Sequence, residues 1–411
     1  MNQAVVLCGG RGERLRPITD SIPKAMVDVA GRPFLATLIE QLGEQGIERF
    51  VFCTGYRGDC VSKYFDDGSR FGTEIAYSNG SALWPTGRRI YEARSLLDQR
   101  FLLMYSDNFA MVNLATLVDQ HLESGATATL STVRKHEGNV SDGDRSVVYG
   151  RRRSEALPRV EVGYMMVERD PMLSTMAGLP LAPDVDFADV LVALSDSGSL
   201  GAVQIHGGYQ SISDPVRLEL SRTFMSPKRL LLIDRDGTIN EKPKQGEYVT
   251  RQEDFKLIGQ NVDAMVELAE IGFQFAVITN QAGVARGVVD PDELDRIHQY
   301  MVSTLAERGV TVRGVYVSPH HWEEESFDRK PNPGLFFKAS QELQFRLDRV
   351  IYVGDDIRDC QAAANAGCSM VYINADGEND HMPVSTMQQW IVRNLGEAVP
   401  TIRSFYEGFE R

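Results

Sequence analysis

The sequence predicts an α/β protein built from two Rossmann-like, three-layer α/β/α domains in tandem. Its 411 residues exceed the size of one ordinary domain. In both halves, short apolar runs typical of buried parallel strands alternate with helical segments, which favours sheets covered by helices on both faces. Several of these strands end in glycines or carboxylates, and this is the end at which such sheets bind ligands.

A proline-containing break near residue 225 predicts where the two domains meet. We therefore expect a first domain at 1–225, a second at 226–375 and a tail at 376–411. In the tail, Trp390 and Phe405 predict packing on the body or on a partner subunit, which leaves a homo-oligomer open.

The amino-acid composition limits which binding partners and which cellular location we expect for this protein. A hydrophobic content of 43% and a charged content of 24% are typical of soluble globular proteins. The net charge of −14 argues against nucleic acid or an anionic membrane as a partner. No apolar run approaches the roughly 20 residues of a membrane span, and the N-terminus lacks the shape of a signal peptide. The five cysteines lack zinc-type spacing, which favours a reducing, cytoplasmic location.

A glycine-rich loop follows the first predicted strand, Ala4–Cys8. Glycines let backbone N–H groups approach a phosphate chain closely, and Arg11, Arg14 and Arg16 add fixed positive charge. No Gly-Lys-Ser/Thr closes the loop, so it is not a Walker A motif. A single lysine, Lys24, follows a proline further on. The loop glycines are Gly9, Gly10 and Gly12.

This opening resembles the signature of the sugar-1-phosphate nucleotidyltransferases, which reads Gly-Gly-x-Gly-Thr-Arg-Leu-x-Pro and then Pro-Lys-Pro-Met. The resemblance implies a GT-A-like fold in which the glycine loop and Arg11 hold a nucleoside triphosphate, with GTP as the expected one. It also implies that Arg14 supports the departing pyrophosphate and that Lys24 meets a reacting phosphate. Asp107, which ends a predicted strand, is implied as the Mg²⁺ ligand. The matching residues are Gly9, Gly10, Gly12, Arg14, Leu15, Pro17, Pro23, Lys24 and Met26.

Three positions need separate treatment. Glu13 replaces the usual Thr or Ser of the glycine loop. Ser211 stands where relatives carry a metal-binding acid, and Asp214 follows three residues later. These departures leave open a first domain that binds nucleotide or sugar phosphate without transferring it. Asp186 has two interpretations of equal weight, as an acid that contacts sugar hydroxyls or as the N-cap of the following helix.

The second half opens with the clearest chemical signal, a buried strand that ends in Asp234 and Asp236. Alternating side chains put both carboxylates on one side at the carboxyl end of the strand. One can attack a phosphoryl group to form an aspartyl-phosphate, and the other can act as general acid and base. Two such acids also favour Mg²⁺, which prefers carboxylate oxygen.

Further polar groups follow the later strands of this half. The 275–279 strand ends in Thr279, Asn280 and Gln281, which offer a hydroxyl and amides to a phosphate. Arg329 and Lys330 supply two cations before a helix. The last central strand carries three carboxylates at its end, and strand ends of this kind converge on one crevice. These carboxylates are Asp355, Asp356 and Asp359.

Asp-x-Asp-Gly-Thr, the strand-end threonine, Lys-Pro and Gly-Asp-Asp-x-x-x-Asp, in this order, resemble the four motifs of the haloacid dehalogenase superfamily. The resemblance implies a fold of that type with a minimal cap. It implies Asp234 as nucleophile and Asp236 as acid/base, and it places Thr279 and Lys330 on the phosphoryl oxygens. Asp355 completes the implied Mg²⁺ shell together with Asp234 and the backbone carbonyl of Asp236.

Within that superfamily, the second half is most similar to the D-glycero-D-manno-heptose 1,7-bisphosphate phosphatases. The matching segments are 234–240, 279–287 and 329–331. The resemblance implies that Arg329 contributes to substrate recognition and that Asn280 and Gln281 lie at the substrate. Histidinol-phosphate phosphatases share much of the pattern and remain the alternative.

Those phosphatases often hold zinc in a loop before the third motif. The corresponding residues here are Ser318, His320, Ser326 and Asp328. All three thiolates are absent, and structural zinc strongly prefers closed Cys/His shells, so we expect no zinc.

The two resemblances describe consecutive steps of one route. Removing the 7-phosphate of a heptose bisphosphate yields a heptose 1-phosphate, which a nucleotidyltransferase accepts directly. We therefore predict a bifunctional enzyme of nucleotide-heptose synthesis that acts on sugar phosphates and GTP with Mg²⁺ at both sites. The alternative is a histidinol-phosphate-type or other sugar-phosphate phosphatase with a regulatory, nucleotide-binding first domain.

Overall fold

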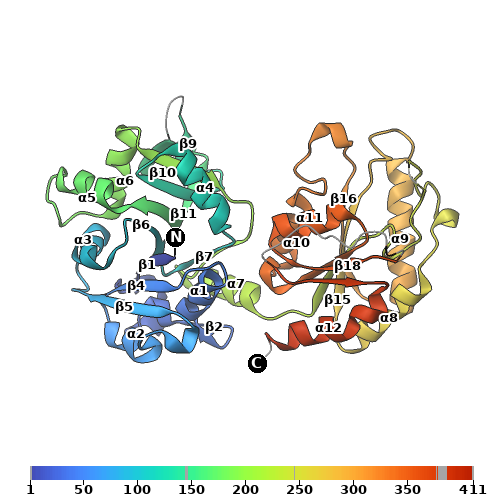
Figure 1. The fold of residues 1–411 in the computed structure, drawn as a ribbon, viewed down its shortest axis with the longest axis horizontal. Helices are drawn as coiled ribbons and strands as arrows, with labels where there is room; N and C mark the ends of the chain where they lie inside the picture. Colours follow the sequence, from blue (N-terminus) through green and yellow to red (C-terminus); the bar gives the residue numbers. More distant parts are fainter. Residues whose placement is uncertain (1, 144–146, 245, 376, 378–386, 410–411) are drawn as a thin grey trace. The chain divides into compact units, whose positions relative to one another are not determined.

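The computed structural model describes residues 2–143, 147–244, 246–375, 377 and 387–409 (Figure 1). The chain divides into two compact units, Met1–Thr223 and Phe224–Arg411, and each is described by itself. Residues 376, 378–386 and 410–411 of the predicted tail lie outside the described residues. Of the helices that the structure describes, none is long and apolar enough to cross a membrane.

The first unit is organised around a nine-stranded mixed sheet in the order β10-β9-β11-β6-β1-β4-β5, with β8 beside β11 and β12 beside β8. Its centre is parallel, since β1 pairs in parallel with both β4 and β6. β11 runs antiparallel to β6 and to β8. The strands are β1 (Gln3–Leu7), β4 (Arg49–Thr54), β5 (Glu74–Asn79), β6 (Arg100–Tyr105), β8 (Ala128–Arg134), β9 (Gly138–Asp142), β10 (Val147–Ser154), β11 (Arg159–Glu168) and β12 (Leu200–Gln204).

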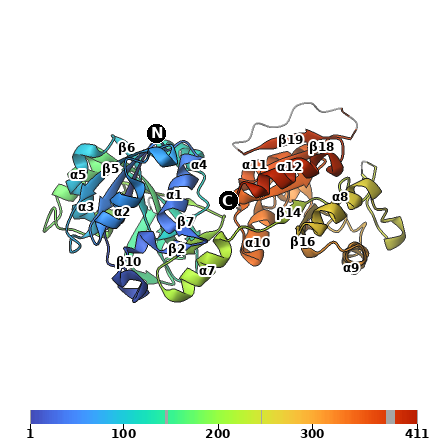
Figure 2. The same cartoon turned by 90° about the horizontal axis from the view of Figure 1, so that it is seen from below.

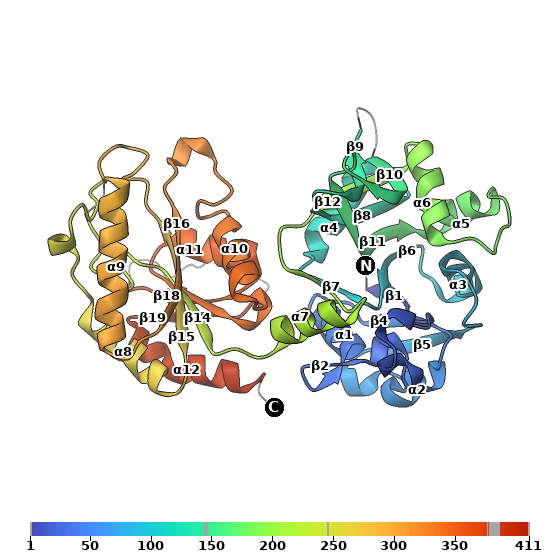
Figure 3. The ribbon, with the colours of Figure 1, turned by 180° about the vertical axis from the view of Figure 1, so that it is seen from behind.

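Helices cover this sheet (Figure 1 and Figure 3), and four short strands form two further antiparallel pairs. Val5, Val51 and Leu103 face one another across β1, β4 and β6 and are almost completely buried, so the apolar runs of the sequence form the core here. The helices are α1 (Phe34–Gly43), α2 (Gly58–Phe65), α3 (Thr86–Glu92), α4 (Leu114–Ser124), α5 (Arg169–Ala177), α6 (Phe187–Asp196) and α7 (Pro215–Met225). The short strands are β2 (Asp28–Val29), β3 (Arg32–Pro33), β7 (Asn108–Ala110) and β13 (Tyr209–Ser211).

The second unit is a six-stranded, all-parallel sheet in the order β16-β15-β14-β17-β18-β19. This is a doubly wound order, and its switch point lies between β14 and β17, where a crevice forms beyond the carboxyl ends of the strands. Asp234 follows β14 directly and Asp355 follows β17 directly, so the topology brings both to the crevice. The strands are β14 (Leu230–Ile233), β15 (Gln274–Asn280), β16 (Val312–Ser318), β17 (Ile351–Gly354), β18 (Ser369–Ile373) and β19 (Gln389–Val392).

Helices lie on both faces of the second sheet, with α10 and α11 on one side and α8, α9 and α12 on the other (Figure 1 and Figure 3). The alternation of strand side chains explains the two layers, because Leu231 and Ile233 enter the core formed with α8, α9 and α12. On the opposite face, the ring of Phe336 packs edge-on against Tyr352 at 4.8 Å. The helices are α8 (Gly259–Glu270), α9 (Pro291–Glu307), α10 (Gly334–Leu343), α11 (Ile357–Ala366) and α12 (Leu395–Glu407).

The end of the chain belongs to this second unit. β19 adds the sixth strand, and α12 packs alongside it (Figure 2). The Tyr406 hydroxyl donates a hydrogen bond to Leu230 O in β14 and accepts one from Ile351 N in β17. Trp390 and Phe405 meet edge to face at 6.0 Å. The predicted α/β class is confirmed. The sheet of the second unit is parallel, whereas that of the first unit is parallel at its centre and contains antiparallel pairings of β11 that the sequence patterns did not indicate.

Candidate active sites

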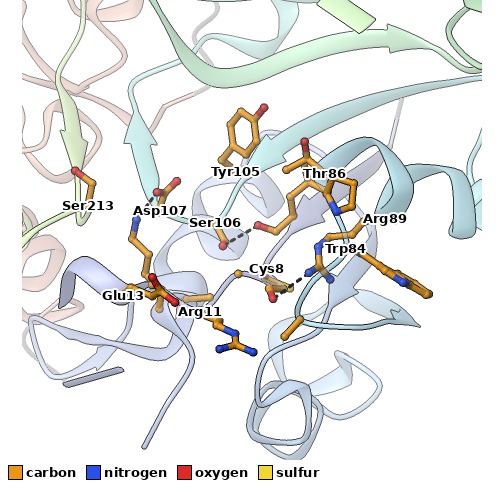
Figure 4. A pocket seen from close by; sticks show the side chains of 18 of the residues that line it. Cys8, Arg11, Glu13, Trp84, Thr86, Arg89, Tyr105, Ser106, Asp107 and Ser213 are labelled. Carbon is orange, nitrogen blue, oxygen red and sulfur yellow. Dashed lines mark hydrogen bonds and ion pairs between the residues drawn. The ribbon is translucent and has the colours of Figure 1, made fainter. Parts of the chain in front are cut away.

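In the first unit, a cavity of about 600 Å³ opens at the carboxyl ends of β1 and β6 (Figure 4). That volume lies in the range of small-molecule sites. Its wall contains eight residues that the sequence singled out in this half for binding or chemistry, so the fold brings them together, whereas Arg16 is absent from the wall and pairs with Asp20 at 3.3 Å. The eight residues are Gly9, Gly10, Arg11, Gly12, Arg14, Lys24, Asp107 and Asp186.

Local packing shapes the glycine loop. Gly12 has a φ of 63°, in the left-handed region, and a Cβ there would lie 2.9 Å from Cβ of Lys24. Arg89, which is 5% exposed, holds the loop from behind by donating hydrogen bonds to Gly9 O at 3.2 Å and to Thr54 O at 2.8 Å. The sequence analysis missed Arg89, whose only signal is its place in an arginine pair on α3.

Lys24 and Asp107 form an ion pair across the cavity, with Nζ 2.5 Å from Oδ2. Mg²⁺ in phosphate-transferring sites is commonly bound by one or two carboxylates together with substrate phosphates. One partly exposed carboxylate in a cavity lined by a glycine loop and arginines fits that donor set. Lys24 and a cation would share Asp107 when nucleotide is bound.

The segment expected to supply a second acid supplies a hydroxyl instead. Ser211 lies in β13 opposite Asn108 and is buried. Ser213 lines the cavity and faces Asp107 (Figure 4). Asp214 accepts a hydrogen bond from Arg217 N at 3.0 Å and is absent from the cavity wall.

Asp186 occupies the N-cap position of α6, but its side chain makes no capping hydrogen bond. The first helical N–H, of Phe187, is bound by the Thr86 hydroxyl at 2.8 Å. The Asp186 carboxylate lines the cavity and pairs with Arg151 at 3.4 Å. The Asp186 side chain therefore does not cap α6, and its carboxylate lies at the cavity.

The second site is centred on a buried lysine. Lys330 is 3% exposed, and its Nζ lies 2.8 Å from Asp234 Oδ1 and 2.7 Å from Asp359 Oδ1. It also donates to the Tyr352 hydroxyl at 2.7 Å and to Ile278 O at 3.1 Å. Burial raises the pKa of Asp234 to about 8, although Lys330 opposes that rise. The nucleophile predicted from the sequence thus lies beside the predicted cation.

The same crevice fits a divalent cation. Carboxylate oxygens of Asp234, Asp355 and Asp359 lie within 4.8 Å of one another. Asp355 Oδ1 is buried and has no hydrogen-bond partner among the described residues. Gly237, with a φ of 88°, borders this group, and a Cβ there would lie 2.2 Å from Asp355 Oδ2. Hard oxygen donors of this kind suit Mg²⁺. Since both oxygens of Asp359 are already bonded, Asp234 and Asp355 are the side chains that could hold it.

Asp236 is held by donors from three side chains. Arg235 makes a two-pronged contact with it, Asn240 Nδ2 donates at 2.9 Å, and Gln281 Nε2 donates at 2.7 Å. Burial raises the pKa of Asp236, but Arg235 and these hydrogen bonds outweigh burial and hold that pKa below its ordinary value. The carboxylate is therefore ionised and fixed in orientation.

The predicted phosphate-binding side chains at the end of β15 have different hydrogen-bond partners. Thr279 is 1% exposed, and its hydroxyl accepts a hydrogen bond from Gln281 at 2.9 Å. Gln281 thus links Thr279 to Asp236. Asn280 instead makes a reciprocal pair with the backbone of Lys330, at 3.0 and 3.1 Å, and so fixes the segment that carries the lysine.

Arg329 and the loop before it form the rim of this half. Arg329 is 9% exposed and donates to His320 O at 3.1 Å, and burial lowers its pKa. In the loop that carries His320, Nδ1 of this residue contacts Glu324 at 2.8 Å, and His321 forms a capping box with Glu324.

Sequence reasoning missed two participants in this site, Tyr352 and Lys242, and the role of a third. Tyr352 lies within β17 and bonds both Lys330 and Asp359, yet an apolar strand run gives no sign of this. Lys242 pairs with Asp355 at 2.7 Å from a loop without a motif. Asp359 belonged to a recognised motif, but its role as the second partner of the buried lysine depends on the fold.

Comparison with known proteins follows the two units. Residues 3–142 match the family model described as nucleotidyl transferase, and residues 320–373 match that of the haloacid dehalogenase-like hydrolases. A D-glycero-beta-D-manno-heptose-1,7-bisphosphate 7-phosphatase of Photorhabdus laumondii is 32% identical over 180 residues, which are 42% of this chain and 94% of that protein. The chain belongs to this phosphatase family.

A second phosphatase relative agrees with that assignment. The Escherichia coli (strain CFT073) protein of the same name is 33% identical, over 42% of this chain and 93% of its own length. A putative glucose-1-phosphate thymidylyltransferase structure from Bacillus anthracis is 17% identical with a TM-score of 0.48, and covers 54% of this chain and 94% of its own. The family matches confirm the predicted fusion of a nucleotidyltransferase with a haloacid dehalogenase-type phosphatase, and the chain is an enzyme.

Proposed function

We propose that this chain carries out two consecutive steps of nucleotide-heptose synthesis. The second domain removes the 7-phosphate from D-glycero-D-manno-heptose 1,7-bisphosphate. The first domain then transfers a nucleotidyl group, GMP from GTP, to the heptose 1-phosphate. The observation that carries the phosphatase step is the cluster of Asp234, Lys330 and Asp355 at the switch point of a chain that belongs to this family.

The phosphatase reaction uses two half-steps. The phosphate ester binds as its monoanion and passes its proton to the Asp236 carboxylate. A carboxylate oxygen of Asp234 then attacks the phosphorus, the bond between phosphorus and the sugar oxygen breaks, and Asp236 gives that oxygen the proton. A water molecule then gives a proton to Asp236, and the oxygen of that water attacks the same phosphorus. The bond to Asp234 breaks, which restores the carboxylate and releases inorganic phosphate. Lys330 and Thr279 hold phosphoryl oxygens, and Mg²⁺ held by Asp234 and Asp355 supplies charge neutralisation when bound.

Transfer in the first domain depends on positioning. The glycine loop with Arg11 holds the triphosphate, and Arg14 supports the departing pyrophosphate. A phosphate oxygen of the sugar attacks the α-phosphorus in line, and the bond to the β-phosphate breaks. Lys24 contacts a reacting phosphate, Asp107 holds Mg²⁺, and the Asp186 carboxylate meets the sugar.

A second candidate is a first domain that binds nucleotide without transferring it. Ser213 at the position facing Asp107, with no acid from the 209–215 segment in the cavity wall, favours this candidate. The second domain could then act as a phosphatase on histidinol phosphate or on another sugar phosphate.

We propose domain limits of 1–225 and 226–375 for the two activities, with the tail completing the second domain. The five cysteines are free thiols, which fits the cytoplasm, where sugar phosphates and GTP are available.

A substrate panel tests this proposal. Phosphate release should be fastest with the heptose bisphosphate and much slower with histidinol phosphate, and Asp234→Asn should abolish it. Pyrophosphate release from GTP with heptose 1-phosphate should exceed that from ATP, CTP or UTP, and Asp107→Asn should remove it. Preference for histidinol phosphate, or no pyrophosphate with any triphosphate, would favour the second candidate.

A further inference from the structure

The residue between the two aspartates of the phosphatase motif carries a fully buried guanidinium. The Arg235 side chain is 0% exposed, and a buried charge of this kind is stable only when its donors are paired. Nε donates to Asp236 Oδ1 at 3.1 Å, and Nη2 reaches Oδ1 at 2.9 Å and Oδ2 at 2.8 Å. Two of its three nitrogens thus hold one carboxylate.

The third nitrogen is bound by a histidine from a distant helix. Arg235 Nη1 lies 3.0 Å from His298 Nε2, and His298 is 7% exposed on α9. Since a guanidinium has only donors, Nε2 accepts, and the imidazole is neutral with its proton on Nδ1. Burial and the charge of Arg235 lower the pKa of His298 to about 4, so this state holds at neutral pH.

We propose that His298 is a positioning residue of the phosphatase: by accepting from Arg235 Nη1, it fixes the guanidinium that orients the Asp236 carboxylate for proton transfer. This inference rests on the proposed role of Asp236 as acid and base. Among the described residues, the hydrogen bond of the His298 ring is to Arg235 and not to the Asp236 carboxylate, so its contact with the acid is made through the guanidinium.

The geometry explains why a single acceptor matters. Without His298, Nη1 is a buried donor with no partner, and the guanidinium gains by turning toward any other acceptor. Such a turn breaks the two-pronged contact with Asp236, and Asn240 and Gln281 alone then hold the carboxylate. A general acid must lie within hydrogen-bond reach of the oxygen that it protonates, so a small rotation is costly.

The test separates proton transfer from all other functions of the site. The Mg²⁺-loaded full chain is mixed rapidly with an alkyl phosphate, whose leaving oxygen needs a proton, or with 2,4-dinitrophenyl phosphate, whose leaving oxygen needs none. We expect His298→Leu to slow the first turnover of the alkyl phosphate by roughly 10- to 100-fold, which reaches only the lower limit of general acid catalysis because the acid is misplaced and not removed. The dinitrophenyl ester should slow by less than about three-fold, because nucleophilic attack by Asp234 is untouched.

Three further variants complete the design. His298→Gln keeps an acceptor and should recover most of the rate with the alkyl phosphate. Met301→Ala, a buried residue on the same helix, should lower the thermal midpoint without the dependence on leaving group. On an Asp236→Asn background, His298→Leu should cost less than about two-fold more, since positioning an absent acid has no effect.

The outcomes divide cleanly. In His298→Leu, equal losses with both esters, no loss with the alkyl phosphate, or a full additional loss on the Asp236→Asn background would overturn the inference. If Asp236→Asn itself slows both esters alike, the proposed role of Asp236 is wrong instead. Should His298→Leu fail to fold, His298→Phe, whose ring offers no nitrogen acceptor, takes its place with both esters and on the Asp236→Asn background.

Discussion

The buried Lys330 permits a quantitative prediction for Lys330→Met. Its ammonium is 3% exposed and lies within 2.8 Å of carboxylate oxygens on Asp234 and Asp359. Methionine matches the length of the stem, so the main loss is electrostatic, with little cavity cost. Removing one partner of a buried ion pair costs about 3–5 kcal/mol, and we expect that loss in the free energy of unfolding of the second unit.

Urea unfolding in EDTA measures this loss. Of the three tryptophans in the chain, Trp84 belongs to the first unit, so a Trp84→Phe background makes fluorescence report on the second. Lys338→Met removes an exposed lysine from α10 and should change stability by less than about 0.5 kcal/mol. Asp359→Asn combined with Lys330→Met should cost about 1–3 kcal/mol less than the sum of the two single changes. A loss below about 1 kcal/mol in Lys330→Met, or simple additivity, would refute the reasoning.

Three other expectations follow from the same unit. Gly237→Ala should cost about 1–3 kcal/mol in stability and weaken Mg²⁺ binding in calorimetry, because the added Cβ would overlap the Asp355 carboxylate. An unchanged Mg²⁺ affinity would contradict this. Lys242→Met should tighten Mg²⁺ binding by about two- to five-fold, since the lysine competes for Asp355, whereas Lys244→Met, in the same loop, should do less; equal effects would point to charge alone. Between pH 6.5 and 4, His298 is protonated in the unfolded chain but stays neutral in the folded one. The free energy of unfolding should therefore fall as the pH falls, by up to about 3 kcal/mol. His298→Gln should make this pH dependence weaker in urea titrations.

Much of the phosphatase site was predictable because strand order and local sequence agree there. Asp234, Thr279 and Asp355 each follow or end an apolar run, and parallel strands bring such ends together at a switch point. The glycine loop of the first domain was predictable for a similar reason, since it follows the central strand β1 directly.

The remaining contacts depend on the tertiary fold. His298 shows only helical periodicity in the sequence, and its contact with Arg235 spans 63 residues. Tyr352 shows only the apolar pattern of a strand. In the first unit, Ser213 and Arg89 reach the cavity through segments whose placement depends on the sheet. Asp186 illustrates the limit of local rules, because Thr86 binds the helical N–H that the N-cap pattern assigns to the aspartate.

Chemical trapping of the covalent intermediate tests the central claim most directly. The Asp236→Asn variant, with Mg²⁺ and 2,4-dinitrophenyl phosphate, whose leaving oxygen needs no proton, should accumulate phosphate on the enzyme because the base of the second half-step is missing. Borohydride reduces an acyl phosphate to the alcohol, so mass spectrometry should find homoserine in place of aspartate at residue 234. Homoserine at another residue, or an unlabelled chain that still releases phosphate, would contradict the proposed nucleophile.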